Sequence, residues 1–278
     1  MSIKKTLQHN KYTSFLIGKV RELQYQIIPS VIFGFLFNVK KFLRLYHVTQ
    51  KSPYEKLKLI KDKHKGERCF IVATGPSLKI QDLEKLHKEV TFSMNSVCLA
   101  FDETEWRPTY YGIQDKGVYK KLESYIKNFN AECKFIGDSI SIHNNIPKDY
   151  YIFPLNLLNH SFSHKKYNTK FSDNAFAEIY DGYTITYSLI QIAVYMGVKE
   201  IYLLGADCNY SSDMNHHFKD YGHVDPTFLS SRDKMISAYK VAKTYADQNN
   251  IKIFNATRGG VLEVFDRVDF DSLFKVTS

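Results

Sequence analysis

The chain has 278 residues, of which 44% are hydrophobic, enough to bury one sizeable core. Its net charge of +9 is unevenly distributed, because residues 1–68 carry 15 Lys and Arg against 4 Asp and Glu, whereas the rest carries 23 against 25. A nucleic-acid-binding domain concentrates positive charge on its folded body, so this nearly neutral body argues against nucleic acid as a partner.

The four cysteines lie far apart in the sequence, at Cys69, Cys98, Cys133 and Cys208. They lack the C-x-x-C spacing of a zinc site and show no disulfide framework, so we expect a reducing, cytoplasmic setting. The residues after Lys4 and Lys5 are polar where a signal peptide would be apolar, so no signal peptide is predicted.

The first predicted element is a helix around the apolar run at residues 27–37, in a stretch without acidic residues between Glu22 and Glu55. Basic residues flank the run on both sides, at Lys19, Arg21, Lys40, Lys41 and Arg44. Its 11 residues fall short of the roughly 20 that a bilayer-spanning helix needs. We therefore predict an amphipathic helix on a membrane surface, at the inner face of the cell membrane, with its basic residues on anionic headgroups. Packing on the body or a dimer contact is the alternative.

From residue 68 onward, short apolar runs alternate with amphipathic stretches. The runs predict strands at residues 69–74, 90–95, 108–115, 133–138, 150–155, 200–207 and 251–257. The stretches predict helices at residues 80–88, 116–129, 184–197 and 230–249. This alternation indicates an α/β fold with a Rossmann-like, doubly wound and mostly parallel sheet that helices cover on both faces.

The pattern divides the chain into a basic, aromatic-rich helical segment at residues 1–67 and a Rossmann-like domain at residues 68–278. Residues 139–180, rich in His, Asn, Lys and Tyr, interrupt the alternation and are predicted to form a lid subdomain over the active edge of the sheet. The sequence leaves the oligomeric state open, a homo-oligomer included.

The first strand of this domain runs into the loop Thr74-Gly75-Pro76-Ser77. Ligands of open α/β sheets bind beyond the carboxyl ends of the strands, and the N–H groups at a following helix start attract anions. Gly75 would let the backbone approach such a ligand. The loop is neither a Walker A motif nor a full G-x-G-x-x-G motif, and an ordinary strand-to-helix corner is the alternative interpretation.

Polar residues also follow the later strands. Asn95 ends the second strand, and Gln114 and Asp115 end the third. Amide side chains offer donors and acceptors to base edges and ribose hydroxyls, although the same residue types cap helices and turns. Gly205 and Asp207 close the strand at residues 200–207, where a carboxylate suits a ribose or a base amine.

Two further features suit an anionic ligand. Thr184 and Thr186 precede a long apolar helix, where their hydroxyls either cap the helix or bind a phosphate or carboxylate. Arg258 stands beside two glycines after the last strand, and its guanidinium is predicted to bind a phosphate or carboxylate.

A histidine-rich loop follows Asp207. Tyr210, His216, His217 and His223 lie in it without the spacing of a metal site, and no metal is expected. One positioned imidazole suffices for a general base, and a tyrosine hydroxyl suits a departing phosphate. Surface histidines of a polar loop are the alternative interpretation.

In order and spacing, "VATGPSL", "SMNS", "YYGIQD" and "TITYSLIQIAVYMGVKEIYLLGADCNY" resemble the bacterial sialyltransferases of glycosyltransferase family 42. They also resemble the related MptE-like domain proteins and motility-accessory glycosyltransferases. The resemblance covers residues 68–260, and residues 1–68 have no counterpart in it. It implies a modified Rossmann-like fold with a lid, a CMP-activated nonulosonic acid as donor, and inversion without a metal.

The resemblance also implies roles for individual residues. It implies nucleotide contacts for Asn95 and for the Thr74 loop, whose first residue is usually asparagine in the family, and a donor contact near Gln114. Thr184 would hold the sugar carboxylate or phosphate. Tyr210 would steady the leaving phosphate, and His217 would be the catalytic base, with His223 as the alternative.

These observations predict a glycosyltransferase that moves sialic acid or a related sugar from a CMP-sugar to a glycan or lipid-linked acceptor. It would need no cofactor beyond the donor substrate. An MptE-like pyrophosphokinase that uses ATP and Mg²⁺, and a transferase for another nucleotide sugar, remain alternatives. A non-enzymatic nucleotide-binding protein is the third.

Overall fold

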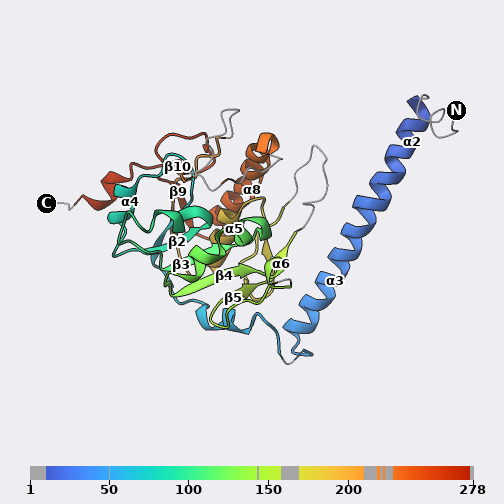
Figure 1. The fold of residues 1–278 in the computed structure, drawn as a ribbon, viewed down its shortest axis with the longest axis horizontal. Helices are drawn as coiled ribbons and strands as arrows, with labels where there is room; N and C mark the ends of the chain where they lie inside the picture. Colours follow the sequence, from blue (N-terminus) through green and yellow to red (C-terminus); the bar gives the residue numbers. More distant parts are fainter. Residues whose placement is uncertain are drawn as a thin grey trace.

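The computed structural model describes residues 11–49, 51–142, 144–157, 169–209, 218–219, 222 and 228–275. Its centre is an eight-stranded sheet in the order β10-β9-β8-β1-β2-β3-β4-β5 (Figure 1), and every pairing in it is parallel. The strands are β1 (Arg68–Val72), β2 (Val90–Met94), β3 (Tyr110–Ile113), β4 (Cys133–Gly137), β5 (Tyr151–Phe153), β8 (Glu200–Leu204), β9 (Lys252–Asn255) and β10 (Asp266–Arg267). The predicted parallel α/β fold is confirmed.

The sheet is buried on both faces, as its continuous apolar strands require. Along β1, Cys69 and Ile71 point into one hydrophobic core, and Phe70 and Val72 point into the other. The first core contains α7 (Ile185–Tyr195) and one side of α8 (Phe228–Gln248). The second core is covered by α4 (Ile80–Glu84), the 3₁₀ turn η3 (Asn95–Ala100) and α5 (Lys116–Lys127).

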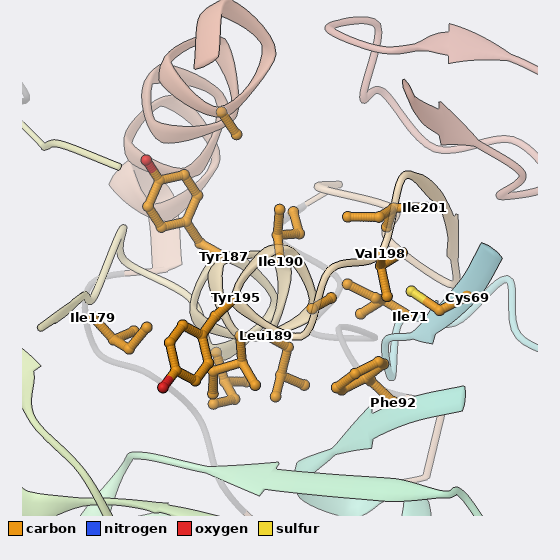
Figure 2. Close-up of a cluster of buried hydrophobic side chains, with 14 of the residues drawn as sticks. Cys69, Ile71, Phe92, Ile179, Tyr187, Leu189, Ile190, Tyr195, Val198 and Ile201 are labelled. Carbon is orange, nitrogen blue, oxygen red and sulfur yellow. The ribbon is translucent and has the colours of Figure 1, made fainter. Parts of the chain in front are cut away.

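Helix α7 lies in the middle of the first core (Figure 2), where Tyr187, Leu189 and Ile190 are fully buried. It packs closely on the sheet, because a Cβ atom added to Gly112 of β3 would lie 2.7 Å from Cδ2 of Leu189. Buried Gln191 accepts hydrogen bonds from the backbone N–H groups of Ser172 and Tyr180, at 3.0 Å each. Helix α7 therefore packs directly on the sheet, and through Gln191 it also holds residues 172–180, the segment that precedes it in the chain.

The strand order reverses between β1 and β8. The chain leaves β1 towards α4 on one face of the sheet, whereas it leaves β8 towards α8 on the other face. Loops that diverge in this way mark the switch point of the sheet, and ligands of open α/β sheets bind in the crevice outside the carboxyl ends of the strands at such a point.

The predicted lid, residues 139–180, is only partly described. Its part at Tyr151–Phe153 is β5, a strand of the central sheet, which confirms the strand predicted at residues 150–155. Another part forms the small parallel pair β6 (Leu155–Asn156) and β7 (Ile179–Tyr180). Residues 158–168 lie outside the described residues, and the lid function stays a prediction.

The N-terminal region is one long helix that leads away from the body (Figure 1). It comprises α2 (Lys11–Glu22), the π-helical turn η1 (Leu23–Ile27) and α3 (Ile28–Leu45). Pro29 lacks an N–H group and would clash with the carbonyl four residues earlier in a regular helix, and the wider π turn just before it relieves that clash. By length and composition this helix suffices to cross a membrane, since it is longer than the 11-residue run on which the prediction of a surface helix was based. The surface location stays a prediction.

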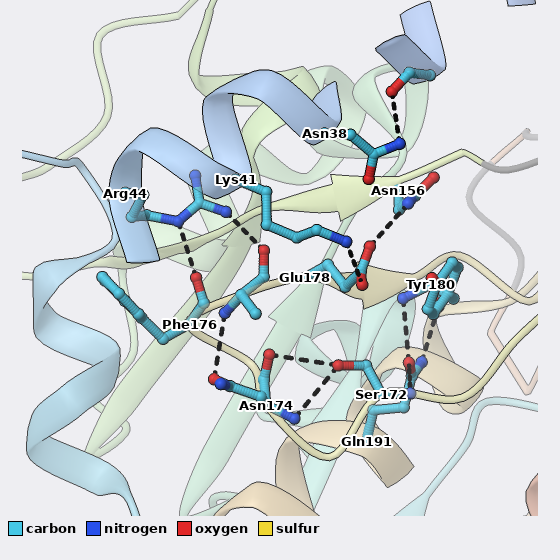
Figure 3. A network of polar contacts seen from close by, with 12 residues as sticks. Asn38, Lys41, Arg44, Asn156, Ser172, Asn174, Phe176, Glu178, Tyr180 and Gln191 are labelled. Carbon is cyan, nitrogen blue, oxygen red and sulfur yellow. Dashed lines mark hydrogen bonds and ion pairs between the residues drawn. The ribbon is translucent and has the colours of Figure 1, made fainter. Parts of the chain in front are cut away.

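The last turn of α3 is attached to the body (Figure 3). The guanidinium of Arg44, only 6% exposed, donates to the carbonyl oxygens of Phe176 at 2.9 Å and Ala177 at 2.5 Å. Nζ of Lys41 lies 2.7 Å from Oε1 of Glu178. These contacts tie the helix to the segment that leads into β7.

The body begins earlier than the predicted boundary at residue 68. Leu57 and Ile60, in the 3₁₀ turn η2 (Glu55–Ile60), are fully buried in the first core. The guanidinium of Arg44 lies 4.5 Å from the ring centre of Tyr54, whose hydroxyl donates to Asp138 at 2.8 Å. The chain from Arg44 onward is therefore part of the folded body.

Candidate active site

The two loops at the β1–β8 crevice touch each other through their backbones. The N–H group of Gly75 donates to the carbonyl oxygen of Gly205 at 2.9 Å. A Cβ atom on Gly75 would lie 2.1 Å from Oδ2 of Asp207 and 2.5 Å from the oxygen of Gly205. Contacts within the protein therefore already require a glycine at residue 75, as the interpretation of an ordinary strand-to-helix corner expects, and its contact with a nucleotide stays a prediction.

Asp207 is the buried acid of this crevice. Its Oδ2 accepts hydrogen bonds from Oγ of Ser77 at 2.8 Å and from the backbone N–H of Ser77 at 3.4 Å. The side chain of the next residue, Cys208, is buried too, and burial raises the pKa of its thiol to about 12. The structure thus joins Ser77 and Asp207, which the sequence predicted as separate ligand contacts, into one hydrogen-bonded pair.

Gly75→Ala is expected to lower the free energy of unfolding by about 1–3 kcal/mol, because the new methyl group overlaps Asp207 and Gly205. Chemical unfolding of the purified variant measures the loss. Gly34→Ala is the control, since a Cβ atom there has nothing within 4 Å. Equal stability of the two variants would contradict the packing seen at the crevice.

Asp207 also predicts a pH dependence. Burial raises its pKa above the ordinary value of 3.8, although the hydrogen bonds from Ser77 favour the charged form. The folded chain therefore binds more protons than the unfolded chain, and the free energy of unfolding falls as the pH rises through the raised pKa. Asp207→Asn keeps an acceptor for Ser77 and removes this titration, so it should lack that fall. The free energy of unfolding is measured for both proteins between mildly acidic and neutral pH. If it changes with pH by the same amount in Asp207→Asn as in the unmodified protein, the prediction is wrong.

Asn95 is the strand-end residue best placed to meet a ligand. Its φ of +44° is a left-handed conformation that asparagine tolerates, and it is half-buried. Its carbonyl oxygen accepts a hydrogen bond from the hydroxyl of Tyr111 at 2.7 Å, which holds the turn. Within the described part of the chain, its side-chain amide has no hydrogen-bond partner. An amide held in this way can bond a base or a ribose.

Gln114, by contrast, is occupied within the protein. Its Oε1 accepts from the hydroxyl of Ser188 at 2.7 Å, and its Nε2 donates to Oδ1 of Asp181 at 3.4 Å. Gln114 therefore links the end of β3 to α7. Asp181, a buried carboxylate at this edge, was missed by the sequence reasoning, although the Asp-Gly pair before Thr184 signals a turn there.

Thr184 and Thr186 both make their hydrogen bonds at the start of α7. Thr184 is the N-cap of α7 and accepts from the N–H of Thr186 at 3.3 Å. The hydroxyl of Thr186, buried, points at Sδ of Met94 at 3.2 Å. The capping interpretation holds for Thr184, and the contact with Met94 brings the positive end of α7 beside the end of β2.

Two of the predicted ligand contacts have other partners. The carboxylate of Asp115 caps α5 by accepting from the N–H of Val118 at 2.8 Å. The guanidinium of Arg258 forms ion pairs with Asp82 and with Asp271. Hydrogen bonds from Lys85 and Arg258 lower the pKa of Asp271 to about 2. Asp115 and Arg258 therefore have structural roles, and their contact with a donor stays a prediction.

The predicted catalytic residues Tyr210, His217 and His223 lie outside the described residues, as does His216. The described residues of this segment reach the carboxyl edge: the N–H of Phe218 donates to the carbonyl oxygen of buried Thr74 at 2.8 Å. Lys219 forms an ion pair with Glu103, and Lys121 of α5 donates to the carbonyl oxygen of Gly222. The segment therefore touches the loop after β1, the turn after η3, and α5.

The described residues do not bring three His, Cys, Asp or Glu side chains together in a group that could hold a metal ion. The histidine loop is not among those residues. Metal independence therefore stays a prediction.

Among curated proteins, none matches the chain in sequence. The MAF glycosyltransferase of Magnetospirillum magneticum is similar at a TM-score of 0.48 and 16% identity, over 82% of this chain. The chain spans only 40% of that protein. The sialyltransferase CstII of Campylobacter jejuni, solved with cytidine-5'-monophosphate, is similar at a TM-score of 0.45 and 17% identity, over 72% of this chain and 84% of that one.

The sequence pattern of a family described as 6-hydroxymethylpterin diphosphokinase MptE-like matches residues 40–213, more than half of the chain. The match includes the crevice loops, Asn95, Gln114 and α7, and it confirms the resemblance to the MptE-like proteins. The chain belongs to the MptE-like family.

Proposed function

We propose that the protein is a glycosyltransferase that moves a sialic acid or a related nonulosonic acid from a CMP-activated donor to a glycan or glycolipid acceptor. The observation that carries this proposal is the reversal of strand order between β1 and β8, with Ser77 and Asp207 on the two loops there and Asn95 at the next strand end. That position suits a nucleotide in a doubly wound sheet. Membership of the MptE-like family supports a transferase. The choice of CMP rests on the sequence resemblance.

The described residues supply binding in this proposal. The free amide of Asn95 meets the base or ribose, and the N-terminus of α7, capped by Thr184, faces the negative charge of the phosphate or the sugar carboxylate. Ser77 bonds Asp207, and together they hold the first loop in place. Fixed dipoles of this kind stabilise charge without the cost of reorganising solvent.

In this proposal, residues of the histidine loop carry out the transfer reaction. His217 removes the proton from the acceptor hydroxyl, the acceptor oxygen bonds the anomeric carbon, and the bond from that carbon to the CMP phosphate breaks. CMP leaves with the electron pair, steadied by Tyr210, and needs no acid because its phosphate is a weak base. The contact of Phe218, the residue after His217, with Thr74 supports a base near the crevice.

A second candidate function is favoured by the family pattern, whose description names a diphosphokinase. Such an enzyme would move a diphosphate group from ATP, with Mg²⁺, to an alcohol: the alcohol oxygen would lose its proton and bond the β-phosphorus, and AMP would leave. The same crevice would then hold the phosphates of ATP.

A thermal-shift comparison separates the two candidates. CMP at 100 times its dissociation constant is expected to add about 2.7 kcal/mol to the free energy of unfolding, with or without EDTA. UDP-sugars and GDP-sugars serve as matched controls and should shift the protein less. A stabilisation by ATP that EDTA abolishes, with none from CMP, would replace the transferase by the diphosphokinase. Binding of CMP without any transfer or hydrolysis of CMP-sugars would indicate a non-enzymatic protein.

We also propose that the protein acts at the inner face of the cell membrane. A glycosyltransferase at the inner face of the cell membrane would reach a lipid-linked acceptor, and the uncovered N-terminal helix suits that location.

A further inference from the structure

The middle of the N-terminal helix, residues 23–39, contains no charged side chain. None of the membrane-candidate window within this helix is buried against the body. Its large apolar side chains are exposed along the whole stretch: Leu23, Tyr25, Ile28, Val31, Ile32, Phe33, Phe35, Leu36 and Val39. An exposed apolar surface of this size is typical of a region that is buried against a partner or in a membrane.

These side chains leave the helix on opposite sides. Residues two apart in an α-helix differ by about 200° in direction, and Val31, Phe33 and Phe35 are all exposed, at 63%, 42% and 67%. A helix that lies in the membrane interface has a strongly polar or charged face along its length. The polar residues of this stretch are all uncharged, at Gln24, Gln26, Ser30 and Asn38, and its apolar side chains point in several directions. An uncharged helix of this composition suits the interior of a bilayer.

The distance between the basic residues at the two ends of the uncharged stretch also fits the thickness of a bilayer. Arg21 and Lys40 bracket the uncharged stretch, and at a rise of about 1.5 Å per residue they are about 28 Å apart. The hydrocarbon core of a bilayer is about 30 Å thick. Their long side chains can extend to the headgroups at either surface. The π turn and Pro29 within the stretch are tolerated in membrane helices.

We propose that this helix crosses a lipid bilayer once, with Arg21 at one surface and Lys40 at the other. Lys41 and Arg44 follow at once and bind Glu178, Phe176 and Ala177, so the body is attached directly at the end of the span. This inference replaces the surface-lying helix predicted from sequence, and it does not rest on the proposed function.

Cysteine labelling in sealed membrane vesicles tests the topology. All four native cysteines are buried, so a membrane-impermeant maleimide gives little background. Ser14→Cys and Leu59→Cys place exposed thiols before and after the span. One of the two is expected to react in sealed vesicles, and the other only after detergent. Reaction of both before detergent would overturn the proposal.

Extraction and a charged variant give an independent test. The full chain should stay in the membrane through high salt and alkaline carbonate and leave it only with detergent, because apolar burial is insensitive to salt. Ile32→Asp with Phe35→Asp should abolish this retention, whereas Ile142→Asp, on an exposed site of the body, should not. Release by salt or carbonate, a soluble oligomer formed through the helix, or full retention of the charged variant would each overturn the proposal.

Discussion

Replacing His217 with alanine is expected to lower turnover by about 10²–10⁴-fold while CMP binding stays nearly intact. The imidazole is assigned to the acceptor hydroxyl and not to the nucleotide, so its loss removes proton transfer and leaves the donor contacts at Asn95 and α7 in place. Initial rates with a CMP-sugar and the thermal shift with CMP measure the two effects separately.

Two variants control this experiment. His87→Ala removes an exposed histidine that pairs with Glu84 away from the crevice, and it should retain full turnover. His223→Ala tests the other candidate base in the loop. Full activity of His217→Ala would remove that residue from the role, and a large fall in His223→Ala alone would move the role to His223.

Arg44→Ala is expected to lower the free energy of unfolding of the body by about 2–4 kcal/mol. The substitution leaves the carbonyl oxygens of Phe176 and Ala177 without their donors, and an unsatisfied buried acceptor costs about 1–3 kcal/mol. Unfolding of the detergent-solubilised chain, followed by tertiary-structure signals of the body, measures the loss.

Two variants, Arg44→Lys and Lys40→Ala, serve as controls for Arg44→Ala. Arg44→Lys keeps the charge but lacks the planar fork that serves two carbonyl oxygens at once, so it should recover only part of the stability. Lys40→Ala alters an exposed residue of the same helix and should change little. Equal stability of Arg44→Ala and Lys40→Ala would show that the Arg44 contacts in Figure 3 contribute nothing to the fold.

The sheet was predictable from sequence because its strands are buried on both faces and therefore read as continuous apolar runs. Strands β2 and β3 and helix α7 lie within their predicted ranges, and β1 begins one residue before its predicted range. Burial of this kind leaves a pattern in consecutive residues, since each strand needs apolar side chains on both sides. The small pair β6–β7 has two residues per strand and leaves no such pattern.

The pairings within the site could not be read from sequence. Ser77 bonds Asp207, Gln114 bonds Asp181, and Arg258 bonds Asp82, and each pair joins residues far apart in the chain. The sequence places polar residues at strand ends, and the parallel topology then gathers them at one edge. Which of them face a ligand depends on tertiary partners, and those partners leave the Asn95 amide available while they occupy Gln114 and Arg258.

The N-terminal helix was underestimated because polar residues interrupt its apolar run. Gln24 and Gln26 separate the run at 27–37 from the apolar residues before it, and Pro29 within the run suggests a break. The backbone continues through them because the π turn Leu23–Ile27 accommodates the proline. Uncharged polar residues and one proline do not end a helix whose neighbouring residues favour it.

The junction at Arg44 limits how the protein can be shortened for crystallisation or assay. The family pattern starts at residue 40, within α3, so the end of that helix belongs to the part of the chain that matches the family. A fragment that starts after Leu45 would lose the donors to the backbone at Phe176 and Ala177, a few residues before the turn that opens α7. A water-soluble fragment should therefore begin no later than Lys40.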